Sequence, residues 1–127
     1  MTSNQRAQQL EDRLVDFAVR CITVAEHLPK TYGGQHFAKQ IIRSGSAPAL
    51  LYGEARGAES SKDFRHKSSI VLKELRETHI NLRIIAEANY LADHLLGDII
   101  AETNELISLF VATIRTLDRK SGNARSH

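Results

Sequence analysis

The sequence has little of what stabilises small secreted or membrane proteins. Its 127 residues include one cysteine, two prolines and no tryptophan. The single cysteine, Cys21, excludes an intrachain disulfide and is typical of a reducing compartment, so we expect a cytoplasmic protein. No apolar run approaches the roughly 20 residues that cross a bilayer, and the polar first residues lack the apolar stretch of a signal peptide. We therefore expect no membrane partner.

Strand-forming patterns are also scarce, whereas helical patterns cover most of the chain. Apolar residues recur at alternating spacings of three and four, which gives each segment one apolar stripe. The segments predicted as helices are residues 10–28, 35–56, 64–85 and 93–119. Gly33 and Gly34 are expected to separate the first two, and the apolar stripe of the last is expected to begin at Leu95 and continue through Ile99 and Leu106. Ser60 and Asn89 have the residue types that begin and end helices, so we place them at the two ends of the third.

Connections as short as these favour antiparallel neighbours. We therefore predict an all-α fold, an antiparallel up-down four-helix bundle. The length suits one domain with a substantial core. We expect this domain to occupy residues 1–120, followed by a flexible basic tail over residues 121–127.

The stretch RSGSAPALLYGEA, residues 43–55, combines turn-forming residues with a helical pattern. Gly45, Pro48 and Tyr52 keep the helical spacing through it, so we place it in the second helix. Pro48 cannot donate a hydrogen bond to the Ser44 carbonyl, and its ring crowds that turn, so we predict a bend near Pro48. A second interpretation, two helices separated by a short irregular joint, stays open.

Five segments in a fixed order resemble one protein family. They are FA at 17–18, QIIRSGS at 40–46, EA at 54–55, SKDF at 61–64, and KELRET at 73–78 followed by LR at 82–83. Together they resemble the four-helix-bundle proteins encoded in intervening sequences of bacterial 23S rRNA genes. The accessory proteins of diversity-generating retroelements are similar to the same bundle.

This resemblance carries expectations about assembly and activity. It implies a short antiparallel bundle that assembles as a homopentamer around a central channel. It implies no known catalytic activity, and for the rRNA-encoded members it implies contact with nucleic acid. We expect no cofactor. The retroelement relatives imply an alternative, a protein–protein adaptor or scaffold that binds a partner such as a reverse transcriptase.

Charge is distributed unevenly along the chain. Residues 30–85 hold ten Lys and Arg against five Asp and Glu, whereas residues 86–118 hold one Arg against six acidic residues. On the predicted third helix, steps of about 100° per residue bring the cations together, roughly 120° from the apolar stripe. We call this set the basic ridge, and its members are Lys62, Arg65, Lys73, Arg76 and Arg83.

An exposed ridge of this kind follows phosphates without reading base sequence. We expect it to bind RNA or DNA, helped by Arg119, Lys120 and Arg125. Two alternatives stay open: the cations are solvated or paired with nearby carboxylates, or the ridge contacts the acidic fourth helix of a neighbouring subunit. Only Tyr32 and Tyr90 lie away from the predicted core stripes, free to stack on bases.

Charged residues that fall in the family-like segments form a second candidate group. We interpret Arg43, Glu54, Glu74 and Glu77 as a polar network of charge pairs that bridges the second and third helices at the edge of the core. A role for them in a channel or binding surface is the alternative.

We expect no catalytic or metal-binding chemistry. The Glu-x-x-His pairs of di-iron bundles are missing from the sequence. His94, Asp98 and Glu102 share one helix face, which we interpret as a solvated face rather than a cation site. Cys21 lies on the apolar stripe, so we interpret it as a core residue rather than a nucleophile.

Overall fold

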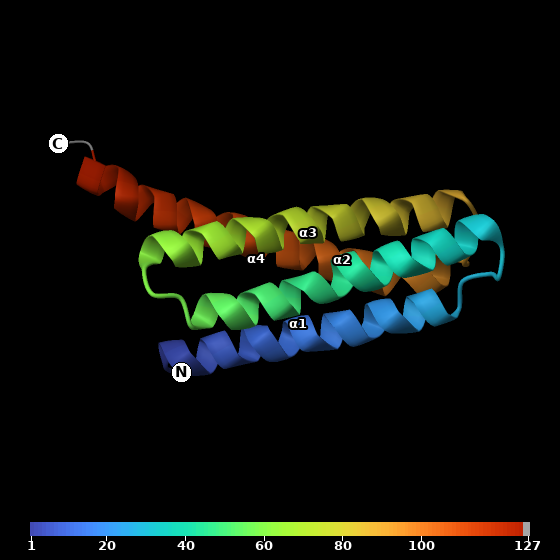
Figure 1. The fold of residues 1–127 in the computed structure, drawn as a ribbon, viewed down its shortest axis with the longest axis horizontal. Coiled ribbons are helices and arrows are strands. Elements are labelled where there is room, and N and C mark those ends of the chain that lie inside the picture. Colours follow the sequence, from blue (N-terminus) through green and yellow to red (C-terminus); the bar gives the residue numbers. More distant parts are fainter. Residues whose placement is uncertain (126–127) are drawn as a thin grey trace.

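The computed structural model describes residues 1–125, and these form four helices (Figure 1). The helices are α1 (Ser3–Glu26), α2 (Tyr32–Arg56), α3 (Ser61–Glu87) and α4 (Asp93–Arg125). Consecutive helices run antiparallel and pack side by side, and α4 makes a smaller contact with α1. The described residues contain no strand. The predicted all-α antiparallel bundle is confirmed.

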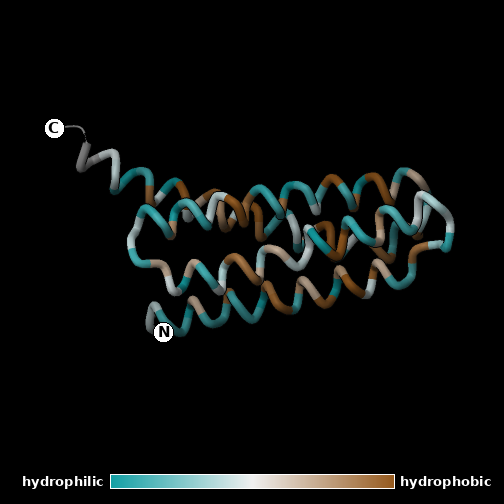
Figure 2. The backbone as a smooth tube through the Cα atoms, viewed as in Figure 1, coloured by the Kyte–Doolittle hydropathy of each residue, from teal (hydrophilic) through white to brown (hydrophobic). Residues whose placement is uncertain are grey.

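The core lies along the axis of the bundle, where the four apolar stripes meet. Hydrophobic and hydrophilic residues alternate along every helix (Figure 2), because spacings of three and four put an apolar residue on one side of each turn. The largest fully buried side chains come from all four helices and include Leu14, Phe17, Ile41, Leu75 and Phe110. Packing of these stripes stabilises helices that would be marginal alone.

The stripe of α4 begins one residue later than predicted. Leu95, expected in the core, is 58% exposed, whereas Leu96 is fully buried. Two adjacent leucines fit the spacing almost equally well, and the packing of α4 against α3 selects the second. From Ile99 onward the predicted stripe holds, with Thr103 and Leu106 also buried.

The third helix has the ends that its sequence predicts. The Ser60 hydroxyl accepts a hydrogen bond from the Asp63 backbone N–H at 3.1 Å, which satisfies a free donor of the first turn. Asn89 has the left-handed φ of 58° that commonly ends a helix. The N–H groups of Asn89 and Tyr90 close the end by binding the carbonyls of Ala86 and Ile85.

The second helix is continuous from Tyr32 to Arg56 and includes Pro48. The alternative of two helices joined irregularly is therefore wrong. The Ser46 hydroxyl donates to the Ile42 carbonyl at 2.6 Å, close to the Ser44 carbonyl that loses its helical donor at Pro48. The bend at Pro48 stays a prediction.

The fourth helix extends to Arg125, past the predicted end at residue 119. Residues 121–125, expected in a flexible tail, are therefore helical, and the rest of that tail lies outside the described residues. Helix-favouring residues such as Arg119 and Lys120 continue the turn without a stop signal before Gly122. None of the helices in the described part of the chain is both long enough and apolar enough to cross a membrane.

Candidate nucleic-acid interface

The outward face of α3 carries most of the basic ridge. Lys62, Lys73, Arg76 and Arg83 are exposed there, whereas the opposite face of α3 is buried in the core. Steps of about 100° place these cations roughly 150° from the buried row, so they point away from the bundle. Within residues 1–125, none of the four makes an ion pair. Their charges are therefore available to a ligand.

Arg65, the fifth member of the ridge, is bound within the chain. Its Nε and Nη2 atoms donate to the two carboxylate oxygens of Asp118 on α4, at 2.7 and 3.1 Å. This bidentate pair raises the pKa of Arg65 and ties the start of α3 to the end of α4. Arg65 therefore contributes less free positive charge than its neighbours.

The end of α4 brings further cations to the same region. Lys62, Arg65 and Lys120 line a hollow of about 440 Å³ between the first turn of α3 and the last turns of α4. Arg119 is exposed and donates to the Thr116 hydroxyl at 3.4 Å. From this hollow the ridge continues along α3 to Arg83, a helical distance of about 30 Å.

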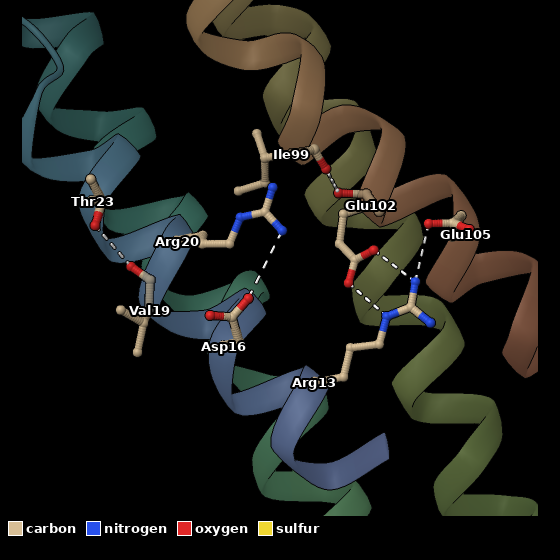
Figure 3. Close-up of polar contacts among 9 residues, drawn as sticks. Arg13, Asp16, Val19, Arg20, Thr23, Ile99, Glu102 and Glu105 are labelled. Carbon is tan, nitrogen blue, oxygen red and sulfur yellow. Dashed lines mark hydrogen bonds and ion pairs between the residues drawn. The ribbon is translucent and has the colours of Figure 1, made fainter. Parts of the chain in front are cut away.

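The carboxylates of α4 could have neutralised the ridge, but two of them face α1. Figure 3 shows Arg13 of α1 between Glu102 and Glu105 of α4. Arg13 donates from Nε and Nη2 to Glu102, both at 2.7 Å, and from Nη2 to Glu105 at 3.1 Å. These hydrogen bonds lower the pKa of Glu102. Glu102 and Glu105 are thus directed toward α1, away from Lys62, Lys73, Arg76 and Arg83.

Sequence reasoning did not identify Arg13. The residue lies beside the apolar stripe of its helix, and the spacing of that stripe does not reveal which helix will be its neighbour. The excess of carboxylates on the fourth segment was the one feature of the sequence that indicated pairing with a cation from another helix.

Arg43 forms the predicted bridge between α2 and α3. Its guanidinium binds Glu74 at 3.0 Å and also contacts Glu77. Asn81 donates to the buried Ser44 hydroxyl at 3.2 Å between the same two helices. Glu54 is exposed about three turns further along α2 and lies outside this group. The network therefore comprises three of its four predicted members.

The two tyrosines expected to be free have different environments. Tyr32 is 96% exposed at the start of α2. Tyr90 is instead partly buried and packs against the core, with its hydroxyl directly against Gly33. The prediction that Tyr90 is free to stack is therefore wrong, because the α3–α4 connection folds its ring inward.

An apolar surface that the sequence did not reveal lies over α1 and α2. The aliphatic side chains there are exposed rather than buried, with Val19 at 55% and Leu50 at 69%. Helical steps place Val15 and Ile22 within about 40° of Glu11, which pairs with Arg56 of α2, so these two border the seam between the helices. We call this surface the apolar face, and its members are Val15, Val19, Ile22, Ile42 and Leu50.

The part of the chain that the structure describes offers no group of three or more His, Cys, Asp or Glu side chains placed to hold a metal ion. His94 and Asp98 are exposed at the start of α4, and Glu102 is occupied by Arg13. Cys21 is fully buried, and burial raises the pKa of its thiol to about 12. A thiol in that state is a poor nucleophile.

Comparisons with known proteins agree with this architecture. Residues 7–112 match the family model described as 23S rRNA-intervening sequence protein. A crystal structure of a protein with unknown function, from the S23 ribosomal protein family of Bacteroides thetaiotaomicron, has 30% sequence identity and a TM-score of 0.77. That match covers 82% of this chain and 96% of the other chain. No curated protein matches the chain.

Proposed function

Because the chain belongs to the 23S rRNA-intervening sequence protein family, we propose that it is a non-catalytic helical-bundle protein that binds RNA or DNA through the basic ridge. The observation that carries this proposal is the set of unpaired cations on the outward face of α3. Two α4 carboxylates, Glu102 and Glu105, are directed toward α1 and held by Arg13, and Asp118 of α4 binds Arg65.

The spacing of the ridge suits a phosphate backbone. Its cations extend along α3 for about 30 Å, and charge neutralisation of phosphates provides most sequence-independent affinity. Four cationic side chains on the convex face of one helix form no pocket that could recognise the edges of bases. We therefore expect weak dependence on base sequence and strong dependence on salt.

A homo-oligomer is the second part of the proposal. Several exposed aliphatic side chains on two neighbouring helices indicate a surface that another protein covers. We assign the apolar face to a second copy of this chain, in line with the homopentamer that the family resemblance implies. This arrangement leaves the basic ridge free, because the ridge lies on α3 and the apolar face lies on α1 and α2. We place the protein in the cytoplasm, because a chain with a single cysteine is typical of a reducing compartment.

Charge reversal on the ridge tests the nucleic-acid proposal. The Arg76→Glu variant should bind a structured RNA and a duplex DNA about tenfold more weakly than the parent chain. The slope of log affinity against log salt concentration should become shallower by the equivalent of about one phosphate contact. Binding can be measured by fluorescence anisotropy over a series of salt concentrations. Arg6→Glu is the matched control, because Arg6 is exposed on α1, away from the ridge.

Two results would contradict the proposal. Equal losses in Arg76→Glu and Arg6→Glu would show that net charge, rather than the ridge, governs binding. Dissociation of the Arg76→Glu oligomer into monomers would place the ridge in a subunit interface and would favour the adaptor or scaffold alternative. Light scattering on the same samples separates these results.

A further inference from the structure

A second cationic surface lies at the end of the molecule opposite the hollow lined by Lys62, Arg65 and Lys120. The connection between α1 and α2 and the first turns of α2 enclose a hollow of about 480 Å³. We call it the Tyr32 hollow, and its lining residues are Lys30, Thr31, Tyr32, Gln35, His36 and Lys39. No carboxylate is among these lining residues, so the hollow has a positive character.

The exposure of Tyr32 is unusual for this chain. Its ring is 96% exposed, whereas Tyr52 is 6% exposed and packs edge-on against Phe64 and Phe110. A tyrosine ring contributes to stability mainly through burial. Tyr32 therefore contributes little to the core, and its flat apolar surface is available to another molecule.

The backbone beneath Tyr32 is held in place on both sides. The Thr31 hydroxyl accepts a hydrogen bond from the Gly34 N–H at 3.1 Å and caps α2. The Gln35 side chain donates to the Pro29 carbonyl at 3.0 Å and fixes the preceding connection. The ring is therefore presented from a fixed frame, which lowers the entropy lost when a ligand is bound.

The Tyr32 hollow lies at the Arg83 end of the basic ridge. Gly33, next to Tyr32, lies against Tyr90, which follows the last turn of α3. Figure 1 shows the connection between α1 and α2 and the C-terminal end of α3 at the same end of the bundle. A strand whose phosphates follow the ridge past Arg83 would therefore arrive at this hollow.

An exposed aromatic ring bordered by cations matches the chemistry of an unpaired nucleotide. Stacking on an aromatic side chain is open to every base, and cations beside the ring hold the flanking phosphates. Bases in a duplex are stacked on one another and cannot reach such a ring. We propose that the Tyr32 hollow binds an unpaired nucleotide, with its base stacked on Tyr32 and its phosphates at Lys30 and Lys39. This inference rests on the proposed binding of nucleic acid along the ridge.

Substitution of Tyr32 separates the hollow from the ridge. The probes are a labelled single-stranded RNA, a single-stranded DNA of the same sequence, and the duplex DNA. Tyr32→Ala should weaken binding of both single strands about tenfold and leave duplex binding unchanged. Tyr32→Phe, which keeps the ring, should bind all three probes like the parent. Leu95→Ala, a truncation of another exposed apolar side chain at the same end, is the matched control.

Each other outcome has a definite meaning. Unchanged single-strand binding by Tyr32→Ala, together with weakened binding by Arg76→Glu, would overturn the hollow and leave the ridge proposal standing. Equal weakening of single-strand and duplex binding by Tyr32→Ala would also overturn the stacking role. Loss of binding to RNA alone would assign the hollow to RNA, through contact with the ribose 2′-hydroxyl. No binding by the parent chain to any probe would overturn both proposals.

Discussion

Arg13 connects two helices that share only a small contact surface. Its guanidinium binds both oxygens of Glu102, a side chain that is 13% exposed. Removing one partner of such a pair leaves the other partly buried and without its hydrogen bonds. The resulting loss of folding free energy exceeds the net contribution of the intact hydrogen bonds. At the scale of single residues, this ion pair links α1 to α4 across the bundle.

The Arg13–Glu102 pair predicts a defined pH dependence of stability. Arg13 lowers the pKa of Glu102 in the folded chain below its ordinary value of 4.5. The stabilisation is therefore fully present above that ordinary value and is lost as the pH falls through the lower, folded pKa. Glu102→Gln should lower the free energy of unfolding by about 1 kcal/mol at neutral pH, since Arg13 is partly exposed.

Thermal unfolding of the parent and of Glu102→Gln between neutral pH and pH about 3 measures this effect. The difference in stability should shrink as the solution becomes acidic. Glu105→Gln is the control, because Glu105 is 73% exposed and should matter less. A difference that stays constant over the whole pH range would contradict the assigned role of the Glu102 carboxylate.

Residue roles set by local chemistry could be predicted from the sequence, and those set by distant packing could not. Cys21 was assigned to the core from its spacing and Asn89 to a helix end from its residue type, and the structure confirms both. Arg13 and the apolar face depend on which helices become neighbours and at what rotation. That information is not contained in the periodicity of any one segment.

Helices α1 and α2 approach each other closely where Gly45 meets Cys21. A Cβ added at Gly45 would lie 2.5 Å from the Cys21 sulfur and 2.6 Å from the Cys21 Cβ. Both atoms belong to a fully buried side chain, so neither can move away easily. The absence of a side chain at Gly45 therefore permits this close approach of the two helices.

Two glycine substitutions should have opposite effects on helix packing. Gly45→Ala gains helix propensity but overlaps Cys21, so we expect a net loss of about 1–3 kcal/mol in the free energy of unfolding. Gly97→Ala lies on α4, where an added Cβ meets nothing within 4 Å, and should stabilise by about 0.5–1 kcal/mol.

Urea unfolding followed by circular dichroism gives both free energies. If Gly45→Ala were as stable as the parent, the two helices would have to move apart without any loss in the free energy of unfolding. That result would show that close packing at Gly45 is not required.

The helices themselves were the most predictable elements. Their number, order and apolar stripes follow from the spacing of three and four, because one buried face is all that an antiparallel neighbour needs. Helix ends were less certain: α2 begins at Tyr32, so the glycines expected to separate the helices lie in its first turn. Gly33 and Gly34 are there because Tyr90 and the Pro29 carbonyl leave no room for a side chain.

At the scale of the whole molecule, the two proposed surfaces are on different helices. The apolar face belongs to α1 and α2, and the basic ridge belongs to α3. An assembly through the apolar face would therefore repeat the ridge around its surface. Several linked ridges would bind one long nucleic acid more tightly than a single chain does.

A charge placed on the apolar face should separate the subunits. Val19→Asp is expected to convert the proposed oligomer into monomers, because a buried unpaired carboxylate is costly in an interface. Light scattering measures the solution mass, for which a pentamer would give five chain masses. Leu95→Asp, at an exposed apolar position outside the face, should keep the mass of the parent. A monomeric parent chain would contradict the assignment at once.

The family resemblance read from the sequence is confirmed by the match over residues 7–112. The assembly that it implies, and the use of the ridge, stay predictions, since they depend on contacts between molecules. Net charge indicated a basic middle and an acidic fourth helix. Only the fold could show that the acidic residues near Arg13 face away from the ridge.

The short connections of the bundle also affect how the chain reaches its fold. Residues 27–31, 57–60 and 88–92 link helices that pack directly on one another. Most contacts therefore form between chain segments close in sequence, and little entropy is lost in closing each hairpin. Chains with such local contacts fold in about microseconds to milliseconds. Each helical hairpin can thus pair without contacts from the rest of the chain.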